Sequence, residues 1–127
     1  MKIKNILLID DDEIDNFVNQ HLVAESNIAE SITVKSSAVD ALEYLKTLTV
    51  EFPSLIFLDI RMPEMDGFEF LEKYEQFPEY LKDQCTVYML SSSLNPKDLD
   101  RIAHNPSVKK FMNKPLSPAM LSDMIGF

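Results

Sequence analysis

The chain is poor in cysteine, in long apolar runs and in basic residues. Its single cysteine, Cys85, excludes an internal disulfide and a cysteine-rich zinc site. No apolar run approaches the roughly 20 residues needed to cross a bilayer, and the N-terminus lacks a signal-peptide pattern. Lys and Arg number 12 against 21 Asp and Glu, a formal net charge of −9. Because nucleic acids and anionic membranes attract basic surfaces, we expect a protein that binds neither. The lack of a membrane span and of a signal-peptide pattern leads us to expect a cytoplasmic protein.

The chain also lacks any sign of a second domain. Its 127 residues match the usual length of one domain, and they are enough to bury a substantial core. The sequence shows no linker, internal repeat or low-complexity segment. We therefore expect residues 1–127 to form one domain, with no output domain attached.

Short apolar runs indicate the strands of a parallel sheet. Three of them do not alternate with polar residues, which is typical of strands covered on both faces. Two weaker runs contain lysines, which suit the edge of a sheet. The expected strands are residues 6–9, 31–36, 55–58, 86–90 and 108–112, of which 31–36 and 108–112 are the edges.

Apolar residues at helical spacing fill the segments between and after these strands. Five helices are expected, near residues 14–22, 38–48, 70–77, 96–103 and 118–125. The first helix is expected to bury a stripe made of Ile14, Phe17, Val18, His21 and Leu22. In the fourth helix, Leu99 is expected to face inward. Five strands alternating with five helices predict a doubly wound α/β fold with right-handed crossovers.

Polar side chains follow the predicted strands at the edge where doubly wound sheets bind ligands. Asp10 and Asp11 follow the first strand, and Asp59 follows the third. Ser91 follows the fourth strand, and Lys114 follows the fifth. Acids, a hydroxyl and an ammonium from four distant segments should therefore meet at one edge of the sheet.

This set of side chains suits phosphoryl transfer onto a carboxylate. Clustered carboxylates without His or Cys favour a hard cation, Mg2+ ahead of Zn2+, with Mn2+ also possible. A lone carboxylate such as Asp59 can act as a nucleophile and form an acyl phosphate. Lys114 and Ser91 could then contact phosphoryl oxygens. On a simpler interpretation, the acids after the first strand only cap a helix, a role that we favour for Asp12.

At these residues the sequence resembles the response-regulator receiver domain of two-component signalling. Residues 59–67, DIRMPEMDG, match the D-x-x-M-P-x-M-D-G phosphoacceptor loop of that family. Asp10-Asp11 matches its acidic pair, Ser91 its hydroxyl position, and Lys114-Pro115 its Lys-Pro pair. The resemblance covers essentially the whole chain, and it implies a flavodoxin-like five-stranded sheet in the order 2-1-3-4-5.

The resemblance implies a role for each of these residues. Asp59 would accept a phosphoryl group from a histidine kinase or a histidine phosphotransfer protein. Mg2+ would be held by Asp11, Asp59 and the backbone carbonyl of Arg61, with Asp10 acting through a metal-bound water. Lys114 would pair with the phosphoryl group, and Ser91 would shift to hydrogen-bond it. The phosphodonor, the carbonyl ligand of Arg61, the water-mediated role of Asp10 and the shift of Ser91 come from the resemblance alone.

The implied function is that of a stand-alone signalling module. It would be a monomer or weak dimer that switches the binding of an unidentified downstream protein. It would catalyse only its own phosphorylation and dephosphorylation. The alternative is a phosphatase of the haloacid-dehalogenase type, whose nucleophile stands in a D-x-D pattern after the first strand. Asp10-Asp11-Asp12 fits that pattern loosely, whereas the Asp59 loop fits the receiver alone.

Overall fold

The computed structural model describes residues 3–91, 95–114 and 116–124. Along these residues, strands and helices follow one another in the order β1 (Ile3–Ile9), α1 (Glu13–Ser26), β2 (Ala29–Lys35), α2 (Ala38–Lys46), β3 (Leu55–Asp59), α3 (Gly67–Tyr74), α4 (Glu79–Lys82), β4 (Thr86–Ser91), α5 (Pro96–Ala103), β5 (Val108–Asn113) and α6 (Pro118–Met124). All strand pairs are parallel, in the order β2-β1-β3-β4-β5. The predicted sheet, its order and its two edge strands are confirmed.

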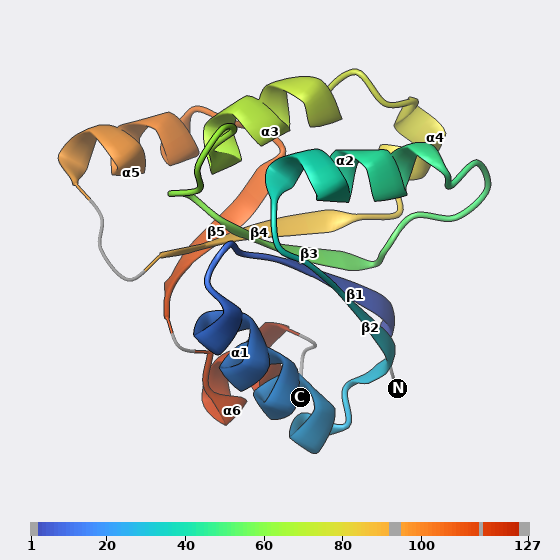
Figure 1. Ribbon diagram of the computed structural model, residues 1–127, viewed down its shortest axis with the longest axis vertical. Helices are drawn as coiled ribbons and strands as arrows, with labels where there is room; N and C mark the ends of the chain where they lie inside the picture. Colours follow the sequence, from blue (N-terminus) through green and yellow to red (C-terminus); the bar gives the residue numbers. More distant parts are fainter. Residues whose placement is uncertain (1–2, 92–94, 115, 125–127) are drawn as a thin grey trace.

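The sheet lies between two layers of helices (Figure 1). Helices α1 and α6 cover one face, and α2, α3, α4 and α5 lie on the other. Within the described residues, none of the helices is both long and apolar enough to span a bilayer. The crossovers bring the carboxyl ends of β1, β3, β4 and β5 to one edge, as a parallel sheet requires.

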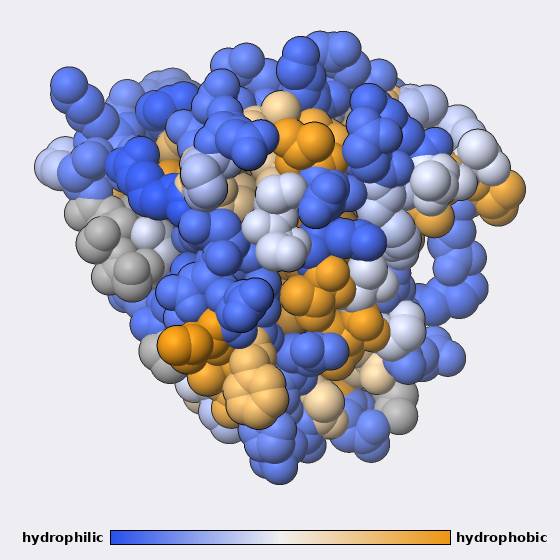
Figure 2. Space-filling model, in the orientation of Figure 1, coloured by the Kyte–Doolittle hydropathy of each residue, from blue (hydrophilic) through white to orange (hydrophobic). Residues whose placement is uncertain are grey.

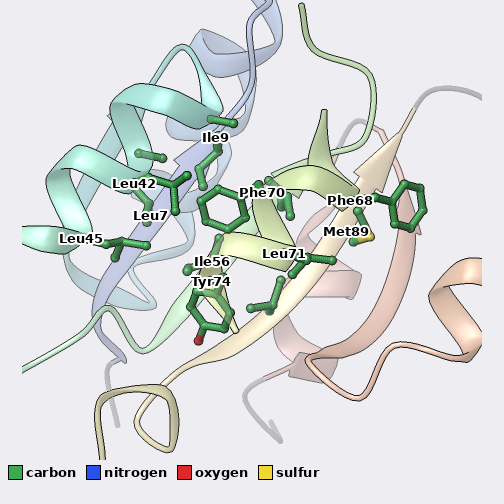
Figure 3. Packing of buried hydrophobic residues seen from close by; sticks show 14 of the residues in the cluster. Leu7, Ile9, Leu42, Leu45, Ile56, Phe68, Phe70, Leu71, Tyr74 and Met89 are labelled. Atoms are coloured by element: carbon green, nitrogen blue, oxygen red, sulfur yellow. The ribbon is translucent and has the colours of Figure 1, made fainter. Parts of the chain in front are cut away.

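Each central strand contributes side chains to two separate cores. In β1, Leu7 and Ile9 pack on the side of α2 and α3, whereas Ile6 and Leu8 pack on the side of α1 and α6. In Figure 3, Phe70 of α3 lies close to Leu7 and Ile9, in the core on the side of α2 and α3. Because successive side chains of a strand point to opposite faces, both faces of a covered strand must be apolar. That requirement explains the continuous apolar runs of the sequence.

Helix α1 turns a different face inward from the one that its apolar pattern predicts. Its buried residues are Asn16, Asn19 and Val23. Ile14 and Phe17 belong to the predicted inward stripe but are 73% and 71% exposed. The prediction of a buried apolar stripe at the start of α1 is therefore wrong, and this helix presents apolar side chains to solvent.

The two inward asparagines explain this orientation, since both find backbone partners. The Asn16 amide donates to the Asp10 carbonyl at 2.7 Å. The Asn19 side-chain oxygen accepts from the Leu116 N–H at 3.2 Å. A buried polar group is tolerated when it is hydrogen-bonded. Asn16 and Asn19 thus tie α1 to the end of β1 and to the segment before α6.

All five predicted helices are present, and the described residues add a sixth, the one-turn helix α4, which precedes β4. It is too short to show an apolar period, and only Leu81 among its residues is buried. Leu99 in α5 is half exposed, at 50%, so its predicted inward position is wrong as well. The residue of α5 that is buried instead is the acidic Asp98.

Candidate functional site

The four segments that the sequence predicts to converge do meet at one edge of the sheet. Asp10 and Asp11 directly follow β1, and Asp59 is the last residue of β3. Lys114 directly follows β5 and reaches both Asp10 and Asp59. Asp10 and Asp59 are buried, whereas Asp11 is exposed. The site is thus a buried pair of carboxylates with an exposed third one at its mouth.

Lys114 is the centre of an ion cluster. Its Nζ atom lies 2.5 Å from Asp10 Oδ2, 2.9 Å from Asp15 Oδ2 and 3.3 Å from Asp59 Oδ1. Burial favours the neutral amine, but contacts with Asp10 and Asp15 outweigh it and raise the pKa of Lys114 above its ordinary value. The lysine therefore stays positively charged at neutral pH.

The Asp59 carboxylate is largely shielded from water and lies beside a second carboxylate, that of Asp10. Burial, helped by the neighbouring charge of Asp10, raises the pKa of Asp59 to about 6. Lys114 opposes this rise through its charge and its hydrogen bond. The negative charges of Asp59 and Asp10 repel each other, and a cation bound between them would reduce this repulsion.

The carboxylates fit a hard divalent cation. Asp10, Asp11 and Asp59 each offer an oxygen, and these oxygens all lie within 4.8 Å of one another. Asp10 Oδ2 is buried and touches the Lys114 ammonium without forming an aligned hydrogen bond. An all-oxygen ligand set of this kind, open to solvent on one side, suits Mg2+, which normally keeps some of its waters.

The loop after Asp59 is held in an unusual backbone shape. Glu64 has a positive φ of 68°, a conformation that costs about 1–2 kcal/mol for a residue with a Cβ. Asp66 then starts α3 with a capping box that includes Glu69. The Gly67 N–H donates to the Ile60 carbonyl at 2.8 Å. These contacts fold the loop back on the end of β3 and fix the Asp59 backbone.

Arg61 makes a contact that the sequence does not predict. Its guanidinium forms an ion pair with Asp98 of α5, and the Asp98 side chain is only 4% exposed. On the same helix, Arg101 stacks over the Phe68 ring at 3.8 Å from its centroid. Two arginine contacts therefore join α5 to the loop and helix that follow Asp59.

Ser91 ends β4 and is buried beside this edge of the sheet. Its carbonyl accepts from the Lys114 N–H at 3.1 Å, which fixes the start of the lysine segment. The neighbouring residue of the predicted Lys-Pro pair, Pro115, lies outside the described residues. Asp12 has the structural role that we favoured, because its carboxylate caps α1 by accepting from Ile14 and Asp15 N–H groups.

Sequence reasoning missed two acids that contact this site. Asp15 binds Lys114 across 99 positions of the chain, and Asp98 binds Arg61 across 37 positions. Residues so far apart in the chain form no local sequence motif, so neither contact could be predicted from spacing. The run of acids from Asp10 to Asp15 was the only available signal for Asp15, since it placed a further carboxylate near the predicted cluster.

The aspartates and the lysine lie at the carboxyl edge of an open parallel sheet, which is where doubly wound α/β domains bind their ligands. A family model described as the response regulator receiver domain matches residues 6–126. The chain belongs to this family, and it is thus a receiver domain of two-component signalling.

Solved structures agree with this assignment. A two component response regulator from Cytophaga hutchinsonii superposes with a TM-score of 0.92 at 33% identity, covering 99% of this chain and 96% of that one. A response regulator receiver protein from Dyadobacter fermentans gives a TM-score of 0.88 at 28% identity, covering 96% and 94%.

Among curated proteins, the chain is similar to parts of longer ones. It is 36% identical, over 73% of its length, to a protein-glutamate methylesterase/protein-glutamine glutaminase of Pseudomonas savastanoi pv. phaseolicola. The chain spans only 24% of that relative. It is also 29% identical to an uncharacterized response regulatory protein of Shewanella oneidensis, and it spans 50% of that protein.

Proposed function

We propose that this receiver domain accepts a phosphoryl group on Asp59 from a histidine kinase or a histidine phosphotransfer protein, with the help of Mg2+. The observation that carries the proposal is the meeting of three carboxylates within 4.8 Å beside a buried ammonium. Asp59 would supply the nucleophile. Asp10, Asp11, Asp59 and the carbonyl of Arg61 would hold the metal.

The proposed step is a displacement at phosphorus. An Asp59 carboxylate oxygen attacks the phosphorus, the phosphorus–nitrogen bond of the donor breaks, and its electron pair stays on the imidazole. Mg2+, when held by these carboxylates, would supply positive charge beside the oxygens of the phosphoryl group. Lys114 offers its ammonium to the same oxygens, and Ser91 lies on the neighbouring strand, where a small shift would bring its hydroxyl to them.

The haloacid-dehalogenase alternative receives less support from the geometry. In a D-x-D pattern at residues 10–12, Asp10 would be the nucleophile and Asp12 the second acid. Yet the Asp12 carboxylate accepts from the Ile14 and Asp15 N–H groups as the cap of α1, so it is not placed to act as the second acid. We therefore expect negligible turnover of a generic phosphomonoester such as p-nitrophenyl phosphate.

The phosphodonor protein would dock over α1. Ile14 and Phe17 expose apolar surface on this helix, and Figure 2 shows hydrophobic colour on the part of the surface that α1 occupies. The same helix carries Asp15, which contacts Lys114 of the site. Exposed apolar side chains on a helix that contacts the site suit a transient partner that must bring its histidine to Asp59.

The downstream partner would bind the surface of α5 and β5. Phosphorylation adds about −1.5 to −2 charges beside Asp59, and α5 is joined to this region through the pair of Arg61 and Asp98. A phosphoryl group that attracts Arg61 would therefore act on α5. This surface carries exposed basic residues, namely Lys97, Arg101, Lys109 and Lys110.

Phosphorylation of Asp59 can be tested directly. Incubation with acetyl phosphate or phosphoramidate and Mg2+ should add one phosphoryl group by intact mass, and hydroxylamine should remove it, because an acyl phosphate is formed. Asp59→Asn should abolish the adduct. Asp83→Asn removes an exposed acid after α4 and should leave phosphorylation unchanged. Equal phosphorylation of Asp59→Asn and wild type would refute the assignment.

A further inference from the structure

We propose that Asp15 is a positioning residue that shares the Lys114 ammonium with the metal-binding carboxylates and takes it over when a cation binds them. It would thereby favour cation binding by Asp10, Asp11 and Asp59, and it would release the lysine to the phosphoryl group. The inference deepens the proposed function and rests on it for the second part only.

The contacts of Lys114 divide into two kinds. Asp10 and Asp59, at 2.5 and 3.3 Å, belong to the group of carboxylates suited to a metal. Asp15, at 2.9 Å, lies outside that group and on a different element, the first turn of α1. Lys114 therefore contacts two candidate metal ligands and also Asp15, which is not one of them.

This sharing matters because an ammonium and a divalent cation compete for the same oxygens. Two positive charges close to Asp10 and Asp59 repel each other, and the effect is strong where side chains are shielded from water. The Lys114 side chain is 9% exposed, so little water solvates the ammonium where it lies. Asp15 gives the ammonium an alternative partner when a metal occupies the cluster.

The ion pair between Asp15 and Lys114 can also break at little cost. Its side chain is 36% exposed, against 5% for that of Asp10. Water can therefore solvate the Asp15 carboxylate once Lys114 turns to a phosphoryl oxygen, whereas a buried carboxylate would be left unpaired. Asp15 does not cap α1, because Asp12 performs that role and accepts from the Asp15 N–H.

A purely structural ion pair between α1 and β5 would predict a different pattern of effects. Its removal would loosen the site and reduce metal binding and phosphorylation together. In the proposed role, removal weakens metal binding, because the lysine falls back on Asp10 and Asp59. Phosphorylation at saturating metal is kept or increased, because no carboxylate outside the site then competes with the phosphoryl group for Lys114.

The experiment compares Asp15→Asn with Glu13→Gln, which removes one exposed charge from the same turn of α1. Mg2+ affinity is measured by NMR titration of the unphosphorylated protein. The rate of phosphorylation by acetyl phosphate is measured at saturating Mg2+. We expect Asp15→Asn to weaken Mg2+ binding about five-fold or more, the lower range of coupling between sites, with a phosphorylation rate at or above wild type.

Glu13→Gln should change Mg2+ affinity by less than about two-fold, since long-range charge effects at exposed positions are screened by salt. Equal Mg2+ affinities for the two variants would overturn the inference. A parallel loss of Mg2+ affinity and of phosphorylation at saturating Mg2+ in Asp15→Asn would overturn it too. If wild type bound Mg2+ but accepted no phosphoryl group, the proposed function would fail, and a selective loss of Mg2+ affinity in Asp15→Asn would still support the positioning role.

Discussion

Gly67→Ala is expected to lower the free energy of unfolding by about 2–3 kcal/mol, the upper range for overpacking, and the Tm by about 10 °C. A Cβ at this position would lie 2.6 Å from the Asp59 carbonyl oxygen and 2.9 Å from Met89 Cε. The methionine end can move aside, but the carbonyl belongs to the last residue of β3. Relief of the clash would displace the backbone of the nucleophile, so phosphorylation should slow as well.

Thermal and urea unfolding in metal-free buffer check this prediction. Glu72→Ala is the matched control, because it introduces the same residue on the exposed face of the same helix, α3. It should stay within about 0.5 kcal/mol of wild type. A Gly67→Ala protein as stable as this control would show that the loop after Asp59 adapts easily, contrary to the packing described above.

Lys114→Met is expected to have a still larger effect, about 3–5 kcal/mol in metal-free buffer, the range for breaking a buried ion pair. Methionine keeps most of the apolar stem but leaves Asp10 and Asp59 without their cation. Mg2+ should restore much of the lost stability, because a bound cation replaces the ammonium and ligand binding stabilises the folded state. The variant should also bind Mg2+ more tightly than wild type.

Urea unfolding with EDTA and with excess Mg2+ separates these contributions. Lys109→Met, at an exposed position of β5, provides the control and should respond to Mg2+ as wild type does. If Lys114→Met lost the same stability with and without Mg2+, the lysine and the metal would not act on the same carboxylates.

The strands of the sheet could be predicted from the sequence because parallel strands covered on both faces consist almost entirely of apolar residues. The apolar runs at residues 6–9, 55–58 and 86–90 have no polar alternation, and each became a central strand. Helix α1 shows the limit of such patterns. Its apolar residues share a helical face, but which face turns inward depends on backbone partners for two asparagines. Asn16 bonds to the nearby Asp10 carbonyl, and Asn19 to the distant Leu116 N–H.

The same limit applies to the site. The position of Asp10, Asp59 and Lys114 follows from where their strands end, so strand prediction alone brought them together. The partners Asp15 and Asp98 sit on helices, and their contacts depend on side-chain directions that are settled only when the layers pack. The additional helix α4 was missed because four residues carry no periodic signal.

The most direct test of the central claim is an amide NMR comparison of wild type and Asp59→Asn, each with Mg2+ and then with added beryllofluoride, which mimics a phosphoryl group on aspartate. In wild type, we predict large shifts in the loop after Asp59, in the Lys114 segment and in α5, which is tied to the loop by Arg61 and Asp98. In Asp59→Asn, beryllofluoride should cause none of them. Identical responses of the two proteins, or a silent wild type, would contradict the assignment of Asp59 as the phosphoacceptor.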